Sequence, residues 1–417
     1  MTGSVKLNTP SAGSVTLSPA DTASNVTVTI PASTATLVNA SSTQTLTNKT
    51  LTAAGGNAVE ATSGPTSTQL AGMRNKIING AMMIDQRNAG ASVSNGAASN
   101  TYTVDRFSIY GTSASKIAAQ QSSTSPSEFL KSLVLTSSAA TSPASSNAYG
   151  LRHIIEGFNC ADLNWGSANA KTVTLSFWVR SSITGTYAVA LFNADAPSRS
   201  YVATYSINSA NTFEYKTVTI SGDTSGTWLT TNGQGIQVWW DLGSGSNFNA
   251  TAGIWNGSLL ARTSGSANWV GTNGATFYIT GVQLEKGATA TPFENRLYGT
   301  ELALCQRYAN KSFPQSTAPA TNAGVNGSIY FGQVAAASTT QTVTGVRFPV
   351  TMRAAPTITI YNPSAANNNI RAVAGADWSG TTTTAIEDSG FGVFGTSSAS
   401  YGVGAAAAYH YLAVAEL

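Results

Sequence analysis

The side chains that most often carry enzyme chemistry are few and scattered in this sequence. The two histidines, His153 and His410, lie far apart, and neither has a cysteine or a second histidine nearby. A protein metal site needs such ligands in a cluster, so we expect no metal centre. The two cysteines, Cys160 and Cys305, are predicted to be free thiols, because a fold built on disulfides carries many more. Motifs for an activated serine, a zinc protease or a phosphate-binding loop are absent, and we expect no cofactor.

The acidic residues are equally poor candidates for catalysis. A glycosidase needs two carboxylates that face each other across one glycosidic bond. Glu156, Asp162 and Asp241 are candidates, but each is interpreted more simply as a loop or turn residue. The adjacent Glu387 and Asp388 would point to opposite faces of a strand. We therefore predict that the protein is not an enzyme, and keep a polysaccharide depolymerase as an alternative.

Aromatic side chains are the most distinctive feature of the composition, with 8 Trp and 15 Tyr in a chain that is only 9% charged. The C–H face of a pyranose ring packs on an indole or phenol ring, and nearby amides and carboxylates then bind its hydroxyls. Two strand-like segments each place a tryptophan opposite an apolar row. The apolar rows are Val173, Leu175, Phe177 and Val179, and Ile236, Val238 and Trp240. The candidate carbohydrate-binding residues on the opposite faces are Trp178, Arg180, Gln237, Trp239 and Asp241.

This carbohydrate platform depends on an arrangement that the sequence does not show. The five residues meet only if both strands lie in one sheet and both apolar rows point inward. The alternative is that the two tryptophans pack under a loop or against a neighbouring subunit, since Trp is mostly buried on average.

Composition favours an all-β protein. Charged residues make up 9% of the chain, against about 25% in an ordinary soluble domain, while Thr, Val, Tyr and Gly suit sheets and turns. The net charge of +3 is too small to indicate a nucleic acid or an anionic membrane as a partner. With no run of about 18 apolar residues and no apolar leader, we expect neither membrane insertion nor a secretory signal.

Alternating apolar and polar residues divide the chain into four predicted parts. Residues 1–72 carry thin apolar rows that cannot form a core alone, so we predict a β-rich stem built from identical copies, with a flexible linker as the alternative. Residues 73–297 predict a jelly-roll-like β-sandwich, 298–316 a helical connector, and 317–417 a small C-terminal β-sandwich domain at the tip. The main strand-like segments are 103–111, 150–159, 171–182, 186–193, 200–208, 213–223, 235–245, 275–287, 342–350, 356–362, 382–388, 389–395 and 409–417.

One stretch, Gly281–Lys311, concentrates seven charged side chains in 31 residues, although the whole chain has only 21 basic and 18 acidic ones. It also holds the clearest helix pattern, with Thr300 as the predicted N-cap and Glu301 in the first turn. The side chains expected to face a neighbouring domain are Leu304, Cys305 and Tyr308. Those expected to be more exposed are Glu301, Arg307 and Lys311. The stretch is interpreted as a joint between two β domains and not as an active site.

Several stretches resemble tail-fibre and receptor-binding proteins of tailed bacteriophages. STQTLTNKTLT at Ser42–Thr52 is similar to a stretch in their N-terminal regions. The segments 74–111, 151–166, 173–182 and 277–308 resemble a carbohydrate-binding-module-like β-sandwich found in many of them. In that family a Leu-Glu-x-Gly-x-x-Ala-Thr-Pro-Phe-Glu segment, here Leu284–Glu294, closes the sandwich. A Glu-Leu-x-x-Cys-Gln-Arg-Tyr segment, here Glu301–Tyr308, begins the connector, and 346–362 resembles the start of their small C-terminal β domain.

The resemblance implies a homotrimeric virion fibre, attached to other virion proteins through its N-terminal region. Such a protein is made in the host cytoplasm and released by lysis. Its expected task is non-catalytic adsorption to a host surface glycan, either a polysaccharide or a lipopolysaccharide. No ligand residue carries over from the family. The alternatives are a purely structural capsid or tail fibre or decoration protein, and a polysaccharide depolymerase.

Overall fold

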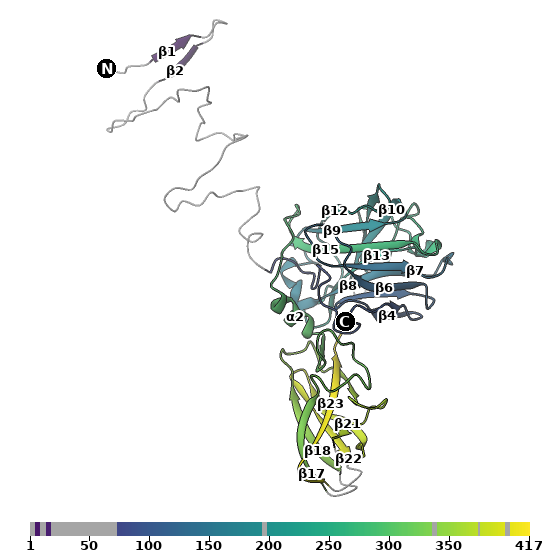
Figure 1. The fold of residues 1–417 in the computed structure, drawn as a ribbon. Helices are drawn as coiled ribbons and strands as arrows, with labels where there is room; N and C mark the ends of the chain where they lie inside the picture. Colours follow the sequence, from purple (N-terminus) through teal and green to yellow (C-terminus); the bar gives the residue numbers. More distant parts are fainter. Residues whose placement is uncertain are drawn as a thin grey trace, which may run out of the picture. The chain divides into compact units, whose positions relative to one another are not determined.

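The computed structural model describes residues 5–8, 14–17, 73–193, 198–335, 340–373, 376–396 and 401–417. The chain divides into two compact units, Met1–Ala61 and Thr62–Leu417, and each is described by itself. In the first unit, β1 (Val5–Asn8) pairs with β2 (Ser14–Leu17) in antiparallel register (Figure 1). The remaining alternating segments of 1–72, including Ser42–Thr52, lie outside the described residues, and the association of identical stems stays a prediction.

The central domain in the second unit consists of two antiparallel sheets. The seven-stranded sheet has the order β14–β11–β10–β13–β8–β5–β4. Its strands are β4 (Ser99–Tyr102), β5 (Phe107–Gly111), β8 (Tyr149–Glu156), β10 (Gly185–Phe192), β11 (Ser200–Ile207), β13 (Gln234–Asp241) and β14 (Trp255–Asn256). The six-stranded sheet has the order β12–β9–β15–β7–β6–β3. Its strands are β3 (Val93–Ser94), β6 (Ile117–Ser122), β7 (Ser132–Ser137), β9 (Val173–Ser181), β12 (Glu214–Ile220) and β15 (Thr276–Lys286).

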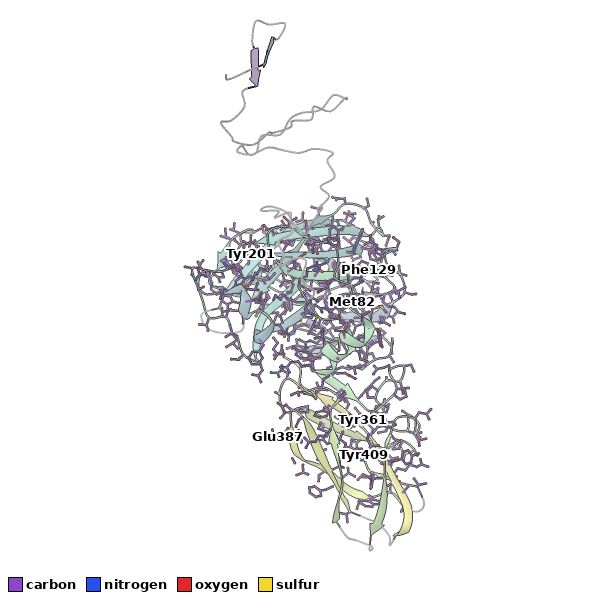
Figure 2. The ribbon with its side chains drawn as sticks, turned by 90° about the vertical axis from the view of Figure 1, so that its left-hand side faces the viewer. Met82, Phe129, Tyr201, Tyr361, Glu387 and Tyr409 are labelled. Atoms are coloured by element: carbon purple, nitrogen blue, oxygen red, sulfur yellow. The ribbon has the colours of Figure 1, made fainter. Side chains whose placement is uncertain are left out.

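The hydrophobic core of the central domain lies between these two sheets. Both apolar rows predicted from alternation point into it, and none of their side chains is more than 1% exposed. Phe177 from β9 meets Trp240 from β13 edge-on, with ring centroids 5.9 Å apart. Full burial of an apolar side chain of this size stabilises the folded state by about 1.5–3 kcal/mol. Figure 2 shows Met82 and Tyr201 in this domain and Tyr361 and Tyr409 in the C-terminal one.

The C-terminal domain is built around its last and longest strand. β23 pairs with β16, β17, β19 and β20, and a separate sheet has the order β18–β22–β21. The bounds are β16 (Ala309–Lys311), β17 (Ile329–Ala335), β18 (Thr340–Arg347), β19 (Thr357–Tyr361), β20 (Arg371–Ala372), β21 (Ser379–Glu387), β22 (Gly390–Thr396) and β23 (Tyr401–Val414). Every strand-like segment predicted between 103 and 417 contains a strand, so the all-β prediction is confirmed.

Helices are short in the described part of the chain. The α-helix there is α2 (Tyr298–Gln306), which connects the central domain to β16 (Figure 1). Single 3-10 turns are η1 (Gly157–Asn159), η2 (Ala161–Leu163), η3 (Ser246–Phe248) and η4 (Trp269–Gly271). The predicted N-cap at Thr300 is wrong, because α2 starts two residues earlier. Leu297 takes the N-cap position in an extended conformation, and its carbonyl accepts the N–H of Glu301 at 3.0 Å.

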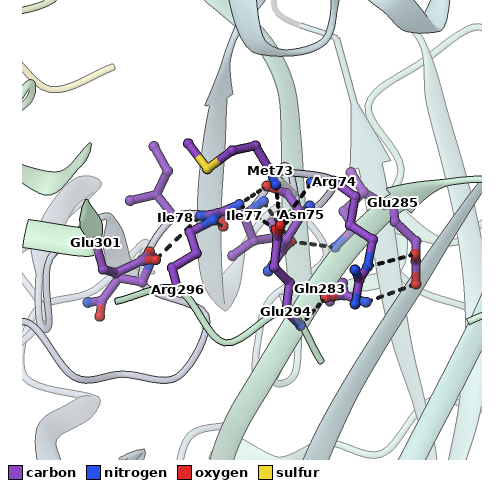
Figure 3. Close-up of polar contacts among 12 residues, drawn as sticks. Met73, Arg74, Asn75, Ile77, Ile78, Gln283, Glu285, Glu294, Arg296 and Glu301 are labelled. Atoms are coloured by element: carbon purple, nitrogen blue, oxygen red, sulfur yellow. Dashed lines mark hydrogen bonds and ion pairs between the residues drawn. The ribbon is translucent and has the colours of Figure 1, made fainter. Parts of the chain in front are cut away.

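The charged stretch after β15 binds the backbone of residues 73–79 (Figure 3). The Glu294 carboxylate accepts N–H bonds from three successive residues, including Asn75 at 2.9 Å. Arg296 donates to two carbonyls of the same segment, and Glu301 accepts the N–H of Asn79. These side chains supply hydrogen bonds that a neighbouring strand would otherwise provide. The charged side chains of this stretch therefore hold residues 73–79 in place by hydrogen bonds to their backbone.

The exposure predicted around α2 is confirmed in part. Cys305 and Tyr308 are fully buried against Ile78 and other residues of the central domain, whereas Leu304 is only half-buried. The prediction that Lys311 is exposed is wrong, because it is only 7% exposed. Lys311 sits at the end of β16, and its Nζ donates to the carbonyls of Gln315 and Thr317 at 3.2 and 2.7 Å. The Lys311 ammonium group therefore donates to these two carbonyl oxygens inside the protein.

Charged side chains also join the C-terminal domain to the central one. The carboxylate of Glu416 accepts from Arg87 at 2.6 Å and from Arg106. The Arg353 guanidinium donates to the carbonyls of Glu416 and Asn232, each at 2.9 Å. These contacts link residues that precede α2 to residues that follow it, and the division into two domains at 298–316 stays a prediction.

Candidate functional site

The five predicted carbohydrate-binding residues do not form one site. β9, with Trp178 and Arg180, belongs to the six-stranded sheet, whereas β13, with Gln237, Trp239 and Asp241, belongs to the seven-stranded sheet. Since the apolar rows of both strands fill the core, the two sets of residues lie on opposite outer faces of the sandwich. The single platform predicted from sequence is therefore wrong.

On the six-stranded sheet, Trp178 and Arg180 pack against neighbouring rings. Trp178 is half-buried, and its ring centroid lies 5.4 Å from that of Tyr215. The guanidinium of Arg180 lies over the Tyr278 ring, 4.9 Å from its centroid, and a second ring is 5.9 Å away. A cation in this position is attracted by the negative face of the ring. Tyr215 is 43% exposed, so this face keeps an accessible aromatic edge.

Asp241 serves the turn after β13 and is not open to a ligand. It is 1% exposed, and its carboxylate accepts the N–H groups of Gly243 and Ser244 at 3.2 and 3.0 Å. Burial raises the pKa of Asp241, while these hydrogen bonds and the charge of Arg262 act in the opposite direction. The predicted role of Asp241 as an acceptor for sugar hydroxyls is therefore not supported by its position.

Gln237 and Trp239 line a groove of about 370 Å³ on the outer face of the seven-stranded sheet. Aromatic rings make up much of its wall: the Trp239 ring centroid lies 5.8 Å from that of Tyr110 and 6.4 Å from that of Phe192. The residues that line the groove are Tyr110, Ala148, Arg152, Phe192, Asn193, Gln234, Gln237, Trp239, Phe248, Leu259 and Ala261. Rings and amides in one hollow provide the two kinds of contact that a sugar needs.

Small residues next to Trp239 in the sheet leave the space that forms the groove. Trp239 pairs in register with Arg152 on one side and with Ala190 on the other. Two residues from Arg152 along β8, a Cβ on Gly150 would lie only 2.4 Å from Cε2 of the Trp239 indole. The indole can therefore lie over Gly150, where any larger residue would displace it. Trp239 is 5% exposed, and its Nε1 has no hydrogen-bond partner among the described residues.

The polar side chains of the groove are amides and one guanidinium. Nε2 of Gln234 lies 3.4 Å from Oε1 of Gln237. Nε of Arg152 donates to Oγ of Ser108 at 3.3 Å. Burial lowers the pKa of Arg152, while the hydroxyls of two nearby tyrosines, Tyr102 and Tyr110, act in the opposite direction. The arrangement can donate to and accept from hydroxyls, but it offers no general acid and base pair.

The sequence interpretation missed most of this groove. Tyr110 and Arg152 are outward-facing residues of predicted strands, so alternation alone identifies their faces. Their convergence on Trp239 depends on β5, β8 and β13 being neighbours, which only the strand order reveals. Phe248 belongs to the short turn η3 and carries no periodic signal.

The carboxylates and histidines considered for catalysis have structural partners. The Glu156 carboxylate accepts hydrogen bonds from Nε and Nη2 of Arg307 at 2.8 and 2.5 Å, and Asp162 pairs with Lys76 at 2.7 Å. His153 is buried with its Nε2 3.2 Å from the carbonyl of Ile78, and burial holds its pKa well below the usual range. Within the described ranges, no three His, Cys, Asp or Glu side chains gather as a metal site would require.

Both cysteines are free and buried. Burial raises the pKa of Cys160 to about 12 and raises that of Cys305 as well, so neither thiol is an activated nucleophile. In the described part of the chain, no helix is long and apolar enough to cross a membrane.

No protein-family model and no curated protein matches the chain. Among solved structures, a putative sugar-binding protein from Bacteroides thetaiotaomicron is 13% identical, with a TM-score of 0.30, and the match covers 51% of this chain and all of that one. A family 11 carbohydrate-binding module of a Clostridium thermocellum cellulase is 11% identical, with a TM-score of 0.25, over 47% of this chain and 99% of that one.

The enzymatically active domain of tailspike protein 4 from bacteriophage CBA120 is 13% identical, with a TM-score of 0.27. That match covers 53% of this chain and only 22% of the tailspike chain. The structures similar to this chain are thus carbohydrate-binding modules and a phage tailspike domain. At such low TM-scores, the assignment of a β-sandwich rests on the strand pairing of the chain itself.

Proposed function

We propose that this protein is a non-catalytic phage fibre protein that adsorbs to a glycan on the bacterial surface. The groove on the seven-stranded sheet carries the proposal, because it combines aromatic rings, of which Tyr110 and Phe248 are partly exposed, with amides and a guanidinium. The resemblance of Leu284–Glu294 and Glu301–Tyr308 to fibre motifs supports the virion assignment. In this proposal the protein is a homotrimer located in the virion and bound to other virion proteins through its N-terminal region.

Weak binding at each groove is enough for this task. Several identical sites on one particle raise the overall affinity by roughly 10²–10⁴ without any new contact. The groove is open to solvent along the sheet, and its rings are partly covered by their own neighbours. We therefore expect modest affinity for a single glycan segment and strong retention of the assembled protein on a polysaccharide surface.

The test is binding of the full chain to an array of bacterial capsular polysaccharides and lipopolysaccharides. Tyr110→Ala removes a partly exposed ring from the groove and should weaken binding by about 1–3 kcal/mol, roughly 5- to 150-fold. The matched control is Tyr215→Ala, which removes an exposed ring from the opposite face. Loss of binding in the control alone would move the site to the six-stranded sheet, and absence of any bound glycan would favour a purely structural fibre.

Two further measurements address the other parts of the proposal. Overnight incubation with a bound polysaccharide should release no reducing ends, since no paired carboxylates line the groove. Release of reducing ends would instead favour a depolymerase. Mass photometry of the purified full chain should give the mass of three copies, and a monomer at micromolar concentration would contradict the homotrimer.

A further inference from the structure

Arg152 is a cation in the groove that has no carboxylate partner. Among the described residues, no acidic side chain lines the groove and no ion pair to Arg152 forms. Its contact with the protein is the bond from Nε to Ser108. The two terminal nitrogens have no acceptor in the part of the chain that the structure describes. Two other half-buried arginines, Arg199 and Arg307, each make a two-bond contact with a carboxylate.

This position leaves a positive charge that is partly removed from water and not balanced by the protein. Burial already disfavours the charged form of Arg152, yet a guanidinium keeps its proton under all ordinary conditions. An anion that reaches the terminal nitrogens would restore the lost interactions. The planar fork of a guanidinium matches two oxygens of a carboxylate or a phosphate, and such charge-assisted bonds are about twice as strong as neutral ones.

The surroundings of Arg152 determine what kind of anion fits. Trp239 is its direct neighbour across the strands, and Tyr110 lies one row further along the same face. Side chains paired in this way have Cβ atoms about 4.5–5.5 Å apart, so a ring surface and a cation lie side by side. Gln234 and Gln237 lie in the same groove and can bind hydroxyls. A molecule that carries an apolar ring face, hydroxyls and one negative charge would engage all of these groups.

We propose that the groove selects an acidic saccharide, whose carboxylate or phosphate binds the terminal nitrogens of Arg152 while its ring packs beside Tyr110. The inference rests on the proposed glycan-binding function and specifies the ligand class of that same groove. Neutral residues of the same polysaccharide would occupy the rest of the groove. The anionic group would then set the preference among glycans, and the rings would contribute binding that is common to all of them.

The experiment compares pairs of saccharides in which one member carries an anionic group and the other does not. Binding of the full chain is measured by calorimetry to oligogalacturonate and to its methyl ester, and to mannose 6-phosphate and mannose. Arg152→Gln removes the charge, and Arg152→Lys keeps the charge but loses the planar fork. The matched control is Arg180→Gln, because Arg180 also lacks a carboxylate partner but rests on Tyr278 on the opposite sheet. A preference in the first ligand pair identifies a carboxylate, and one in the second identifies a phosphate.

We expect the wild-type protein to bind the acidic member of one pair at least about tenfold more tightly than the neutral member. Arg152→Gln should bring that ratio close to one, Arg152→Lys should retain part of it, and Arg180→Gln should leave it unchanged. A wild-type ratio of one, or a ratio that survives Arg152→Gln, overturns this inference while glycan binding itself still stands. If none of the four ligands binds, the inference fails for these anion classes, and the array decides separately on the proposed function.

Discussion

Replacing Glu416 by alanine tests whether buried charge holds the two β domains together. The Glu416 carboxylate is 6% exposed and binds both Arg87 and Arg106. Without it, the guanidinium of Arg106, which is 1% exposed, keeps only the carbonyl of Ile154 at 2.5 Å and the ring of Tyr308 at 3.6 Å. Its Nε already lacks a partner in the described structure. The substitution therefore leaves a buried cation without any carboxylate.

Removing one partner of a buried ion pair costs about 3–5 kcal/mol. The lower end of this range is expected here, because Arg87 is 11% exposed and keeps Asp105 at 3.7 Å. For domains of this size, each kcal/mol lowers the melting temperature by about 2–4 °C, so a loss of about 3 kcal/mol corresponds to about 6–12 °C. Glu416→Gln retains the shape and one acceptor, and should fall between alanine and wild type.

Denaturant unfolding followed by tryptophan fluorescence gives the free energy of unfolding, and a thermal scan gives the melting temperature. The matched control is Glu387→Ala, which removes an exposed carboxylate from β21 in the same C-terminal domain. Surface substitutions of this kind usually change stability by no more than about 0.5 kcal/mol. If Glu416→Ala unfolds with the same free energy as Glu387→Ala, the charge network does not stabilise the joint and the reasoning is refuted.

Three other perturbations have defined outcomes. Because the pKa of His153 is lowered in the folded protein, the unfolded chain binds more protons than the folded one below about pH 6.5. The free energy of unfolding should therefore fall as the pH decreases below that value. In unfolding curves measured at several pH values, His153→Gln should reduce this dependence on pH. In the native protein near neutral pH, Cys160 and Cys305 should react slowly with a thiol reagent, and after unfolding both should react. Rapid labelling of the folded chain would contradict their burial. Gly150→Val should displace the Trp239 indole and abolish glycan binding, while stability falls by about 1–3 kcal/mol; unaltered binding would exclude this groove.

The strands and their buried faces could be predicted from sequence because both depend on local alternation. In β9, Val173, Leu175 and Phe177 recur at every second position, and all three are fully buried. The same pattern predicted the buried row of β13. The helix α2 could be predicted for a related reason, since its residues interrupt the strand alternation on both sides.

The candidate site could not be predicted because strand order is a long-range property. The sequences of β9 and β13 alternate in the same way, and nothing local to either strand places them in different sheets. Arg152 meets Trp239 only because β8 and β13 are adjacent, although many residues separate them along the chain. The bonds from Glu294 to the backbone of residues 73–75 are equally non-local. Alternation identifies the face of a side chain, and only the topology identifies its neighbours.

The ion pairs of Glu416 with Arg87 and Arg106 can form only late in translation. The ribosome releases both arginines long before it reaches the carboxylate that neutralises them. A nascent central domain can close its core between the two sheets, but it must keep this surface hydrated until β23 and the residues after it have been translated. A chain that stops before residue 416 leaves Arg106 without a carboxylate partner, while Arg87 keeps Asp105 at 3.7 Å. Truncated and full-length products would thus differ in the charge that this surface carries.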